Sequence, residues 1–302
     1  MKIYNNLDLN QKHRGGIIAI GNFDGIHLGH QKVINNAKKK AKKKKLPVGL
    51  ITFEPVPVMF FNKKIKNHRI SSLEQKKDQL KKLKLDFLII IKFNKNFSSL
   101  SAEEFIRKII YKKTNCRFLY VSKNFRFGFK RKGNIETLKK YEKRYKFKNI
   151  IVKPLKLKRK IISSTFIRNK IRNGQIEKVN KLLNRNWSIK GKVIKGQKRG
   201  RKIGFPTCNL RLNSYVIPRL GVYAVKVKND NISNDGIANI GYRPTFNGQS
   251  LLLETNIFGI NKNLYNKVIG INFKKFIRPE KKFRNLKDLK QQIKLDIKEA
   301  KK

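Results

Sequence analysis

The chain has 302 residues, 39% of them hydrophobic, and a formal net charge of +57 from 75 lysines and arginines against 18 aspartates and glutamates. This length favours two domains, and the apolar content suffices for a core in each. No apolar run approaches the ~20 residues of a transmembrane helix, and no signal-peptide pattern follows Met1. Cys116 and Cys208 form neither a disulfide framework nor a metal-binding spacing. We therefore expect a cytoplasmic protein without a membrane partner.

The positive charge by itself favours a nucleic-acid partner. Lysine supplies most of it, however, in both halves and together with many asparagines and isoleucines. A/T-rich codons produce this combination without selection for binding. Lysine runs such as the one at 38–45 also fall where a helix faces water. We expect salt-sensitive binding to polyanions in vitro but no specific nucleic-acid ligand.

The first motif follows the apolar run at 17–20, where glycines recur at every fourth position from Gly21 to Gly29. This pattern predicts a strand, a tight loop and a helix N-terminus, whose free N–H groups and dipole bind anions. His27 and His30 lie three residues apart, so both imidazoles face one side of the first helical turn. Two such rings can donate to a phosphorus centre that gains negative charge. A single histidine is more often structural, but the combination favours a phosphate site.

Further along, β-rich runs at 46–53, 86–93 and 118–121 alternate with helices that begin at capping boxes near Ser72 and Ser101. Strands and helices that alternate at this spacing indicate βαβ units and a parallel sheet. Such sheets bind ligands at the carboxyl ends of their strands, where the first motif also lies.

Two more motifs complete this half. The string NFRFG at 124–128 interleaves aromatic and basic side chains, which stack on flat rings and hold phosphates, although alternating phenylalanines are more often core. In ISSTFIR, at 162–168, the hydroxyls cap a helix, which is a sufficient role for them. Arg168, one turn inside that helix, also reaches a phosphate there as a bidentate donor.

After a helix at 176–183 the pattern changes to short β-rich runs without helices between them, which indicates an antiparallel sandwich or barrel. These runs are 187–194, 207–210, 221–227, 237–240, 251–257 and 268–276. A polar helix from about 285 to 301 ends the chain. We place the domain boundary accordingly, giving domains 1–183 and 184–302.

The loop at 196–209 concentrates glycines and cations, which suits a polyphosphate, and it lacks the Gly-Lys-Ser/Thr of a P-loop. Its candidate phosphate-binding residues are Gly196, Arg199, Gly200, Arg201 and Gly204. Thr207 and Asn209 alternate onto one side of a strand and offer oxygen ligands for Mg²⁺ on a polyphosphate, the alternative being a plain loop-to-strand corner. Glu254, an acid within an apolar strand, is the best candidate for a general base, with a salt-bridged structural role as the alternative.

Taken in order, these motifs resemble those of the prokaryotic bifunctional riboflavin kinase/FMN adenylyltransferases (FAD synthetases) over essentially the whole chain. The matching strings are GNFDGIHLGH at 21–30, NFRFG at 124–128, ISSTFIR at 162–168, GRKIGFPTCN at 200–209, ANIGYRPTF at 238–246 and IRPEKKF at 277–283. The first resembles the His-x-Gly-His signature of nucleotidyltransferases. In the fourth, Cys208 replaces the family's alanine, a small change.

The resemblance implies an α/β nucleotidyltransferase-like domain with a Rossmann-like parallel sheet, then an all-β antiparallel barrel with a terminal helix. It implies that ATP and Mg²⁺ serve two steps: phosphorylation of riboflavin to FMN, then adenylylation of FMN to FAD with release of pyrophosphate. In the adenylyltransferase half it assigns catalysis to His27 and His30, ATP binding to Gly21, Phe23, Asp24, Gly29, Ser163, Ser164, Thr165 and Arg168, and flavin binding to Asn124, Phe125 and Arg126. In the kinase half it assigns the base to Glu254, the metal to Thr207 and Asn209, and flavin binding to Asn239, Arg243 and Arg278.

One departure from the family pattern concerns Val56. Relatives commonly read TFEPHP where this chain has TFEPVP at 52–57, and valine neither titrates nor donates a hydrogen bond. We expect the two prolines to hold this segment extended. Two alternatives stay open: a riboflavin kinase with an impaired adenylyltransferase half, and a nucleic-acid binder on a nucleotidyltransferase scaffold. The sequence makes no prediction of oligomeric state.

Overall fold

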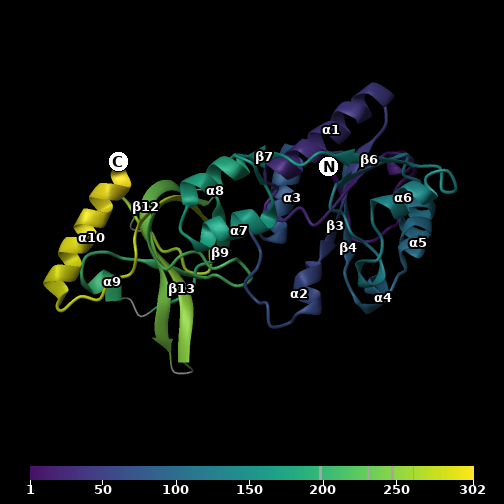
Figure 1. The fold of residues 1–302 in the computed structure, drawn as a ribbon. Helices are drawn as coiled ribbons and strands as arrows, with labels where there is room; N and C mark the ends of the chain where they lie inside the picture. The colour runs from purple at the N-terminus through teal and green to yellow at the C-terminus, as the bar shows by residue number, and fades with distance from the viewer. Residues whose placement is uncertain (197–198, 230–231, 246–247, 261) are drawn as a thin grey trace. The chain divides into compact units, whose positions relative to one another are not determined.

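The computed structural model describes residues 1–302 except 197–198, 230–231, 246–247 and 261, and except the side chains of 199, 202, 244, 245, 248 and 249. The chain forms two compact units (Figure 1). The N-terminal unit comprises Met1–Ile65 and Lys76–Ser163, and the C-terminal unit comprises Lys66–Gln75 and Ser164–Lys302. These units divide the chain earlier than 183/184, because the helix before that point packs with the barrel. The 183/184 domain boundary stays a prediction.

The N-terminal unit is built on a parallel sheet of six strands in the order β1-β4-β3-β2-β5-β6. The strands are β1 (Lys2–Tyr4), β2 (Ile17–Ile20), β3 (Val48–Glu54), β4 (Phe87–Lys92), β5 (Phe118–Ser122) and β6 (Lys148–Val152). The parallel α/β prediction is confirmed. The two edge strands, β1 and β6, were not predicted, because an edge strand is short and carries little apolar pattern.

Helices cover both faces of this sheet, which is why its strands read as continuous apolar runs. The helices are α1 (Leu28–Lys44), α2 (Pro57–Phe61), α3 (Leu73–Lys82), α4 (Lys95–Ser98), α5 (Ala102–Phe105), the π-helix η2 (Ile106–Lys113) and α6 (Ile135–Tyr141). There are also two 3₁₀ turns, η1 (Gln11–His13) and η3 (Phe129–Arg131), and a β-hairpin formed by β7 (Lys156–Leu157) and β8 (Lys160–Ile161). Phe105 and Ile109 pack on one face with Ile18 and Ile51. The helix α1 contacts β2, β3 and β5.

The proline segment after β3 departs from the expected conformation. The strand β3 ends at Glu54, one residue beyond the predicted run at 46–53, and Pro57 opens α2 as its first helical residue, with Val56 at the N-cap. The prediction that both prolines hold the chain extended is therefore wrong at Pro57. Its fixed φ suits a first helical turn, where the missing N–H costs no hydrogen bond. Val56 is buried.

The C-terminal unit contains an antiparallel sheet of six strands in the order β10-β13-β12-β11-β14-β9. They are β9 (Ser188–Lys192), β10 (Cys208–Arg211), β11 (Gly221–Asn229), β12 (Ile232–Thr245), β13 (Gly248–Ile257) and β14 (Val268–Arg278). Just beyond β9, Ile194 pairs with Asn209 of β10 through an N–H···O bond of 2.9 Å, which joins the two edges of the sheet. The predicted barrel is confirmed.

The helices described in this unit after residue 163 are α7 (Ser164–Arg172), α8 (Ile176–Leu183), α9 (Arg199–Lys202) and α10 (Leu286–Lys301). Asn180 of α8 donates to the carbonyl of Phe273 in β14 at 2.9 Å, so α8 belongs with the barrel. The terminal helix α10 lies along the barrel (Figure 1), and its Ala300 packs on Val222 of β11. Among the described residues, none of the helices combines the length and the apolar composition of a membrane span.

Candidate active sites

The histidine pair lies where β2 ends and α1 begins, at the carboxyl edge of the parallel sheet. His27 is the N-cap of α1, and its Nδ1 accepts a hydrogen bond from the backbone N–H of His30 at 3.3 Å. The neutral His27 ring therefore carries its proton on Nε2. The two imidazoles stack with centroids 3.6 Å apart and planes 19° apart. The structure thus brings both side chains to one point, while their catalytic role stays a prediction.

The loop before α1 holds two non-glycine residues in the left-handed region, Phe23 at φ 47° and Ile26 at φ 40°. Such conformations cost about 1–3 kcal/mol each and persist where the surroundings enforce them. Here Thr52 donates to the Asn22 carbonyl at 3.1 Å, and Gln31 donates to the Ile26 carbonyl at 3.0 Å. Both strained side chains are buried. The sequence offers no signal for this strain, which shapes the candidate phosphate loop.

Electrostatics keep His30 neutral. Burial, then His27, then Lys76 lower the pKa of His30 well below its usual value. Lys76, on α3, is itself buried and donates to the Asn22 carbonyl at 2.8 Å. Sequence reasoning missed this lysine, although it falls on the apolar stripe of its helix, three residues after Leu73 and four before Leu80.

Space around the helix start is tight. A Cβ at Gly29 would lie 3.1 Å from the His27 ring and 3.1 Å from the carbonyl oxygen of Ile162. The string ISSTFIR therefore begins directly against the histidines, with Ser163 next in the chain. A Cβ at Gly21 would lie 3.2 Å from the Phe23 ring. Asp24 is buried in the same loop.

The rest of ISSTFIR belongs to the C-terminal unit, because α7 begins at Ser164. Arg168 is buried, and its guanidinium donates to Thr165 Oγ1 at 3.3 Å. The predicted approach of Arg168 to the histidines stays a prediction, since the residues lie in different units. Within the C-terminal unit, burial and the charges of Arg168, Arg172 and Arg69 lower the pKa of His68 to about 4. Sequence reasoning did not single out this cationic group.

The predicted flavin loop follows the carboxyl end of β5, which pairs with β2, so it emerges at the same sheet edge as the histidine loop. Phe125 stacks on Phe127 with centroids 5.4 Å apart and planes 17° apart, and packs partly against the core. Asn124 and Arg126 are exposed. Gly128 has φ 71°, and a Cβ there would lie 2.8 Å from the backbone of Ala102, so glycine is required.

In the barrel, four of the predicted kinase residues, Asn209, Glu254, Asn239 and Arg278, lie in one row that crosses five strands. Asn209 of β10 pairs with Glu254 of β13, which pairs with Asn239 of β12. Asn239 pairs with Val222 of β11, which pairs with Arg278 of β14. Residues directly opposite one another in antiparallel strands point to the same face. Residues up to 69 positions apart in the sequence, 209 to 278, thus share one surface.

Glu254 forms an ion pair with Arg243, whose Nη2 and Nε lie 2.8 and 2.9 Å from Oε2. Arg243 also contacts Glu280 at 3.1 Å, and Asn239 donates to the same carboxylate at 3.3 Å. Burial alone would lower the pKa of Arg243, but its hydrogen bonds to the two carboxylates raise it. The salt-bridged state is present, so base chemistry at Glu254 stays a prediction. Glu280 was not among the predicted site residues.

Arg278 reaches a partner that the sequence analysis did not anticipate. Its Nε and Nη2 lie 2.8 and 2.7 Å from the two oxygens of Asp296, a buried residue of α10. This bidentate pair anchors α10 on the barrel. Flavin binding by Arg278 stays a prediction.

The predicted metal ligands fit a hard cation. Asn209 is buried, and no described residue hydrogen-bonds its Oδ1, so an oxygen that usually finds a partner is left for a ligand. Thr207 is exposed just before β10. Cys208 is buried, and burial raises the pKa of its thiol to about 12, so the neutral thiol takes no part. Among the described residues, no group of three or more His, Cys, Asp or Glu could hold a metal.

Glycines shape the neighbouring phosphate loop. A Cβ at Gly196 would lie 2.2 Å from Nδ2 of Asn209, and one at Gly200 would lie 2.4 Å from the carbonyl oxygen of Phe205. Gly204 has φ 90°, a backbone conformation that residues with a side chain rarely adopt. Arg201 is exposed, whereas the side chain of Arg199 lies outside the described residues.

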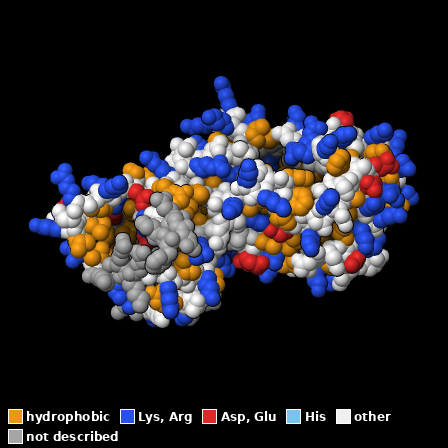
Figure 2. Space-filling view, turned by 90° about the horizontal axis from the view of Figure 1, so that it is seen from below, with side chains coloured by type: hydrophobic (Ala, Val, Ile, Leu, Met, Phe, Trp, Pro, Cys, Tyr) orange, Lys and Arg blue, Asp and Glu red, His pale blue; other side chains and the backbone are white. Residues whose placement is uncertain are grey.

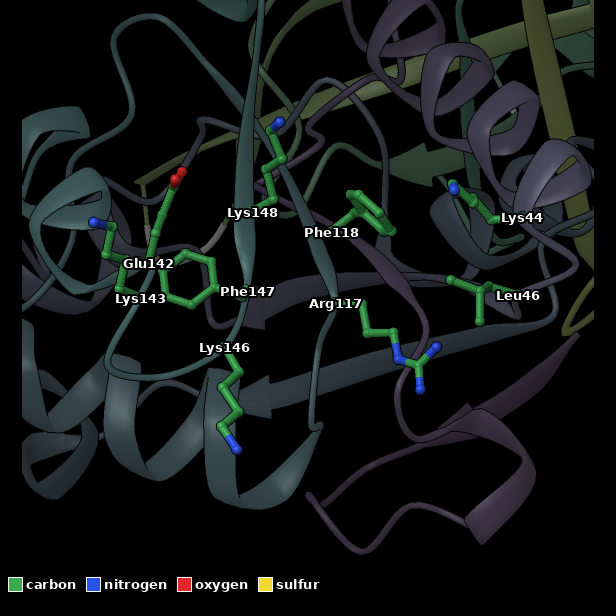
Figure 3. A pocket seen from close by; sticks show the side chains of 9 residues that line it. All are labelled: Lys44, Leu46, Arg117, Phe118, Glu142, Lys143, Lys146, Phe147 and Lys148. Carbon is green, nitrogen blue, oxygen red and sulfur yellow. The ribbon is translucent and has the colours of Figure 1, made fainter.

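A hollow of about 530 Å³ lies elsewhere in the N-terminal unit (Figure 3). Phe118 and Lys148 begin β5 and β6, so it opens at the amino edge of the sheet, opposite the histidine loop. Its rim includes Lys44 from the last turn of α1, where a cation offsets the negative end of the helix dipole. No predicted site residue lines it.

Both units point to one class of protein, the enzymes that transfer phosphorus groups from ATP. The model of the FAD synthetase family matches residues 9–166, and that of riboflavin kinase matches residues 183–302. The chain belongs to the bifunctional riboflavin kinase/FMN adenylyltransferase family.

Relatives over nearly the full length agree. The bifunctional riboflavin kinase/FMN adenylyltransferase of Buchnera aphidicola subsp. Schizaphis graminum is 43% identical over 299 residues, covering 98% of this chain and 96% of its own. The protein of the same name from Haemophilus influenzae is 40% identical over 294 residues, covering 97% and 95%. A solved structure from Streptococcus pneumoniae, described as a macrolide-efflux protein, has a TM-score of 0.87 at 31% identity, covering 99% of this chain and 98% of that one. From it we take the fold alone.

Proposed function

We propose that this chain makes FAD from riboflavin in two ATP-dependent steps, with FMN as the intermediate and the roles divided between barrel and parallel sheet. The observation that carries the proposal is the meeting of two residue sets in one chain. Asn209, Glu254 and Asn239 share one row of the barrel, and His27 stacks on His30 at a helix N-terminus. Two ATP molecules are consumed for each FAD, so we place the reaction in the cytoplasm, where ATP is made and kept.

In the kinase step, Glu254 takes the proton from the terminal ribityl hydroxyl of riboflavin as its oxygen attacks the γ-phosphorus of ATP. ADP leaves, and FMN remains. Arg243 holds the Glu254 carboxylate in place, and the glycine-rich loop at 196–204 receives the phosphates. Thr207 and Asn209 would hold Mg²⁺, which when bound neutralises charge on those phosphates.

In the second step, the FMN phosphate attacks the α-phosphorus of another ATP and pyrophosphate leaves. The attacking phosphate is already ionised, so no protein nucleophile is needed, and the protein contributes positioning and charge stabilisation. The Nε2–H of His27 and a ring N–H of His30 donate to the α-phosphate oxygens. The hydroxyls of 163–165 and Arg168 receive the β- and γ-phosphates, and the loop at 124–126 receives the flavin.

The test is incubation of purified protein with riboflavin, ATP and MgCl₂, followed by chromatographic separation of FMN from FAD. Formation of FMN and then FAD supports the proposal, and absence of both products overturns it. If riboflavin yields FMN but no FAD, and added FMN also yields no FAD, the kinase-only alternative is supported. That alternative rests on Val56, a buried side chain that offers no hydrogen bond where relatives have histidine.

The nucleic-acid alternative predicts clustered cations, whereas Figure 2 shows lysines and arginines spread over the visible face. We therefore propose small-molecule substrates and no specific nucleic acid. Binding to RNA or DNA should be lost near ~0.2 M salt, as counterion release predicts. Tight, sequence-dependent binding above that concentration would favour the alternative.

A further inference from the structure

Lys76 is a buried cation next to the histidine loop. Only 1% of its surface is exposed, although lysine is rarely buried without a dedicated partner. Its Nζ donates to the Asn22 carbonyl at 2.8 Å and to Thr52 Oγ1 at 3.2 Å. Thr52, also fully buried, donates to the same carbonyl at 3.1 Å. Lys76 of α3 and Thr52 of β3 therefore both hydrogen-bond the carbonyl of the same loop residue, Asn22.

That peptide precedes the strained part of the loop. The Asn22 carbonyl belongs to the peptide before Phe23, which has φ 47°. A charge-assisted hydrogen bond is roughly twice as strong as a neutral one, so the ammonium can hold a conformation that Phe23 would otherwise leave. The ring of Phe23 in turn lies 5.0 Å from the ring of His30. The hydrogen bonds to Asn22 therefore also help to position Phe23, whose ring contacts His30.

Lys76 also acts on His30 through its charge. Burial lowers the pKa of His30 most, and His27 at the N-cap of α1 and Lys76 on α3 lower it further. A neutral imidazole donates one N–H without carrying a charge, while the ammonium below the loop supplies a fixed positive charge. Negative charge that collects at the loop is stabilised by that cation, because the site is partly shielded from water.

We propose that Lys76 is a positioning residue for adenylyl transfer, holding the Asn22 carbonyl so that the strained loop keeps His27 and His30 aligned on the α-phosphate of ATP. The inference rests on the proposed function of this same site. The ammonium touches the loop and Thr52 and takes no part in bond making. Its loss is expected to lower the rate of FAD formation and to leave FMN formation unchanged.

The experiment compares Lys76→Met, which keeps length and loses charge, with Lys81→Met, an exposed position on the same helix. Lys76→Met should lower kcat for FAD formation from FMN by about 10- to 100-fold. FMN formation from riboflavin in the same preparation should stay within about twofold, because the barrel in the other unit carries that step. Lys81→Met should leave both rates unchanged.

A second readout separates positioning from mere packing. The chain has only four histidines, so the Cε1–H signals of all four can be followed by NMR as pH is varied. In Lys76→Met the titration midpoint of His30 should rise, because a neighbouring positive charge is gone. An unchanged midpoint together with unchanged FAD formation overturns the proposal. If the wild type made no FAD, the proposed function would fail, while the His30 midpoint would still decide whether Lys76 acts on that ring.

Lys76→Met removes the donor to a buried carbonyl and can unfold the unit. In that case Thr52→Val decides, since it keeps Lys76 and deletes one acceptor of its ammonium. FAD formation that falls several-fold relative to FMN formation supports the positioning role. Equal ratios in Thr52→Val and wild type overturn it.

Discussion

The two units place their candidate residues for phosphorus chemistry in opposite ways. In the parallel sheet, the candidate residues come from loops at the carboxyl edge, as in the histidine loop at 21–30 after β2. In the barrel, Asn209, Glu254 and Asn239 come from strand interiors, where register aligns them across β10, β13 and β12. The first design depends on local conformation, including two strained residues, and the second depends on pairing between distant segments. Mutations should therefore separate the two activities cleanly.

The largest effect is expected at Glu254. Glu254→Gln keeps a hydrogen-bond acceptor for Arg243 but removes the proton acceptor, so FMN formation should fall by about 10²- to 10⁴-fold. FAD formation from supplied FMN should be unchanged. The matched control is Glu280→Gln, because Glu280 pairs with the same guanidinium. Equal, small losses in both variants would mean that Glu254 is only a structural partner of Arg243.

The reverse separation is expected at His30. His30→Ala removes one of two donors at the developing charge, so FAD formation should fall by about 10²- to 10³-fold while FMN formation continues. His13→Gln, a change in the same unit outside the site, should keep FAD formation. Chromatography of both products in one reaction measures the two activities together. Loss of both activities in a folded His30→Ala protein would contradict the division of labour.

A smaller effect should sharpen the role of the barrel loop. In Gly196→Ala the new Cβ would lie 2.2 Å from Nδ2 of Asn209, so the amide must move. We expect about tenfold slower FMN formation and a higher Mg²⁺ requirement, with FAD formation unchanged. In the control Gly191→Ala, the Cβ would lie 3.3 Å from a Leu210 methyl, a contact that relaxes more easily. Equal Mg²⁺ dependence in both variants would remove Asn209 from the metal site.

The sequence predicted the two sheet types, most strands and the placement of both histidine rings on one side of the helix start, because these follow from apolar periodicity and helical spacing. It predicted the barrel residues only as separate motifs, because a single sequence does not indicate which residues pair across neighbouring strands. It missed Lys76 and His68, whose surroundings come from segments far away in the sequence. It also missed the Arg278–Asp296 pair, because an arginine in a recognised motif gives no sign of a partner 18 residues later. A charged residue on the apolar stripe of a helix, as Lys76 is, was the signal in the sequence that sequence reasoning did not use.

The smallest effect concerns His68, whose pKa in the folded C-terminal unit is about 4, well below the unfolded value of 6.5. Between these values the unfolded chain binds a proton that the folded chain does not. The free energy of unfolding is therefore lowered as pH falls from about 6.5 toward 4. Because the ring is half-buried, solvent screening reduces the effect to about 1 kcal/mol.

His68→Gln should remove this part of the pH dependence. Trp187, the single tryptophan, is buried in the same unit and donates to the Ile70 carbonyl at 2.8 Å, so its fluorescence reports unfolding of the segment that carries His68. Urea unfolding at pH 7 and pH 4.5 should show a smaller loss of stability in His68→Gln than in wild type. His13→Gln, in the other unit, should not change the pH dependence of the Trp187 transition. An identical loss in His68→Gln and wild type would show that burial and the three arginines do not hold His68 in its neutral form.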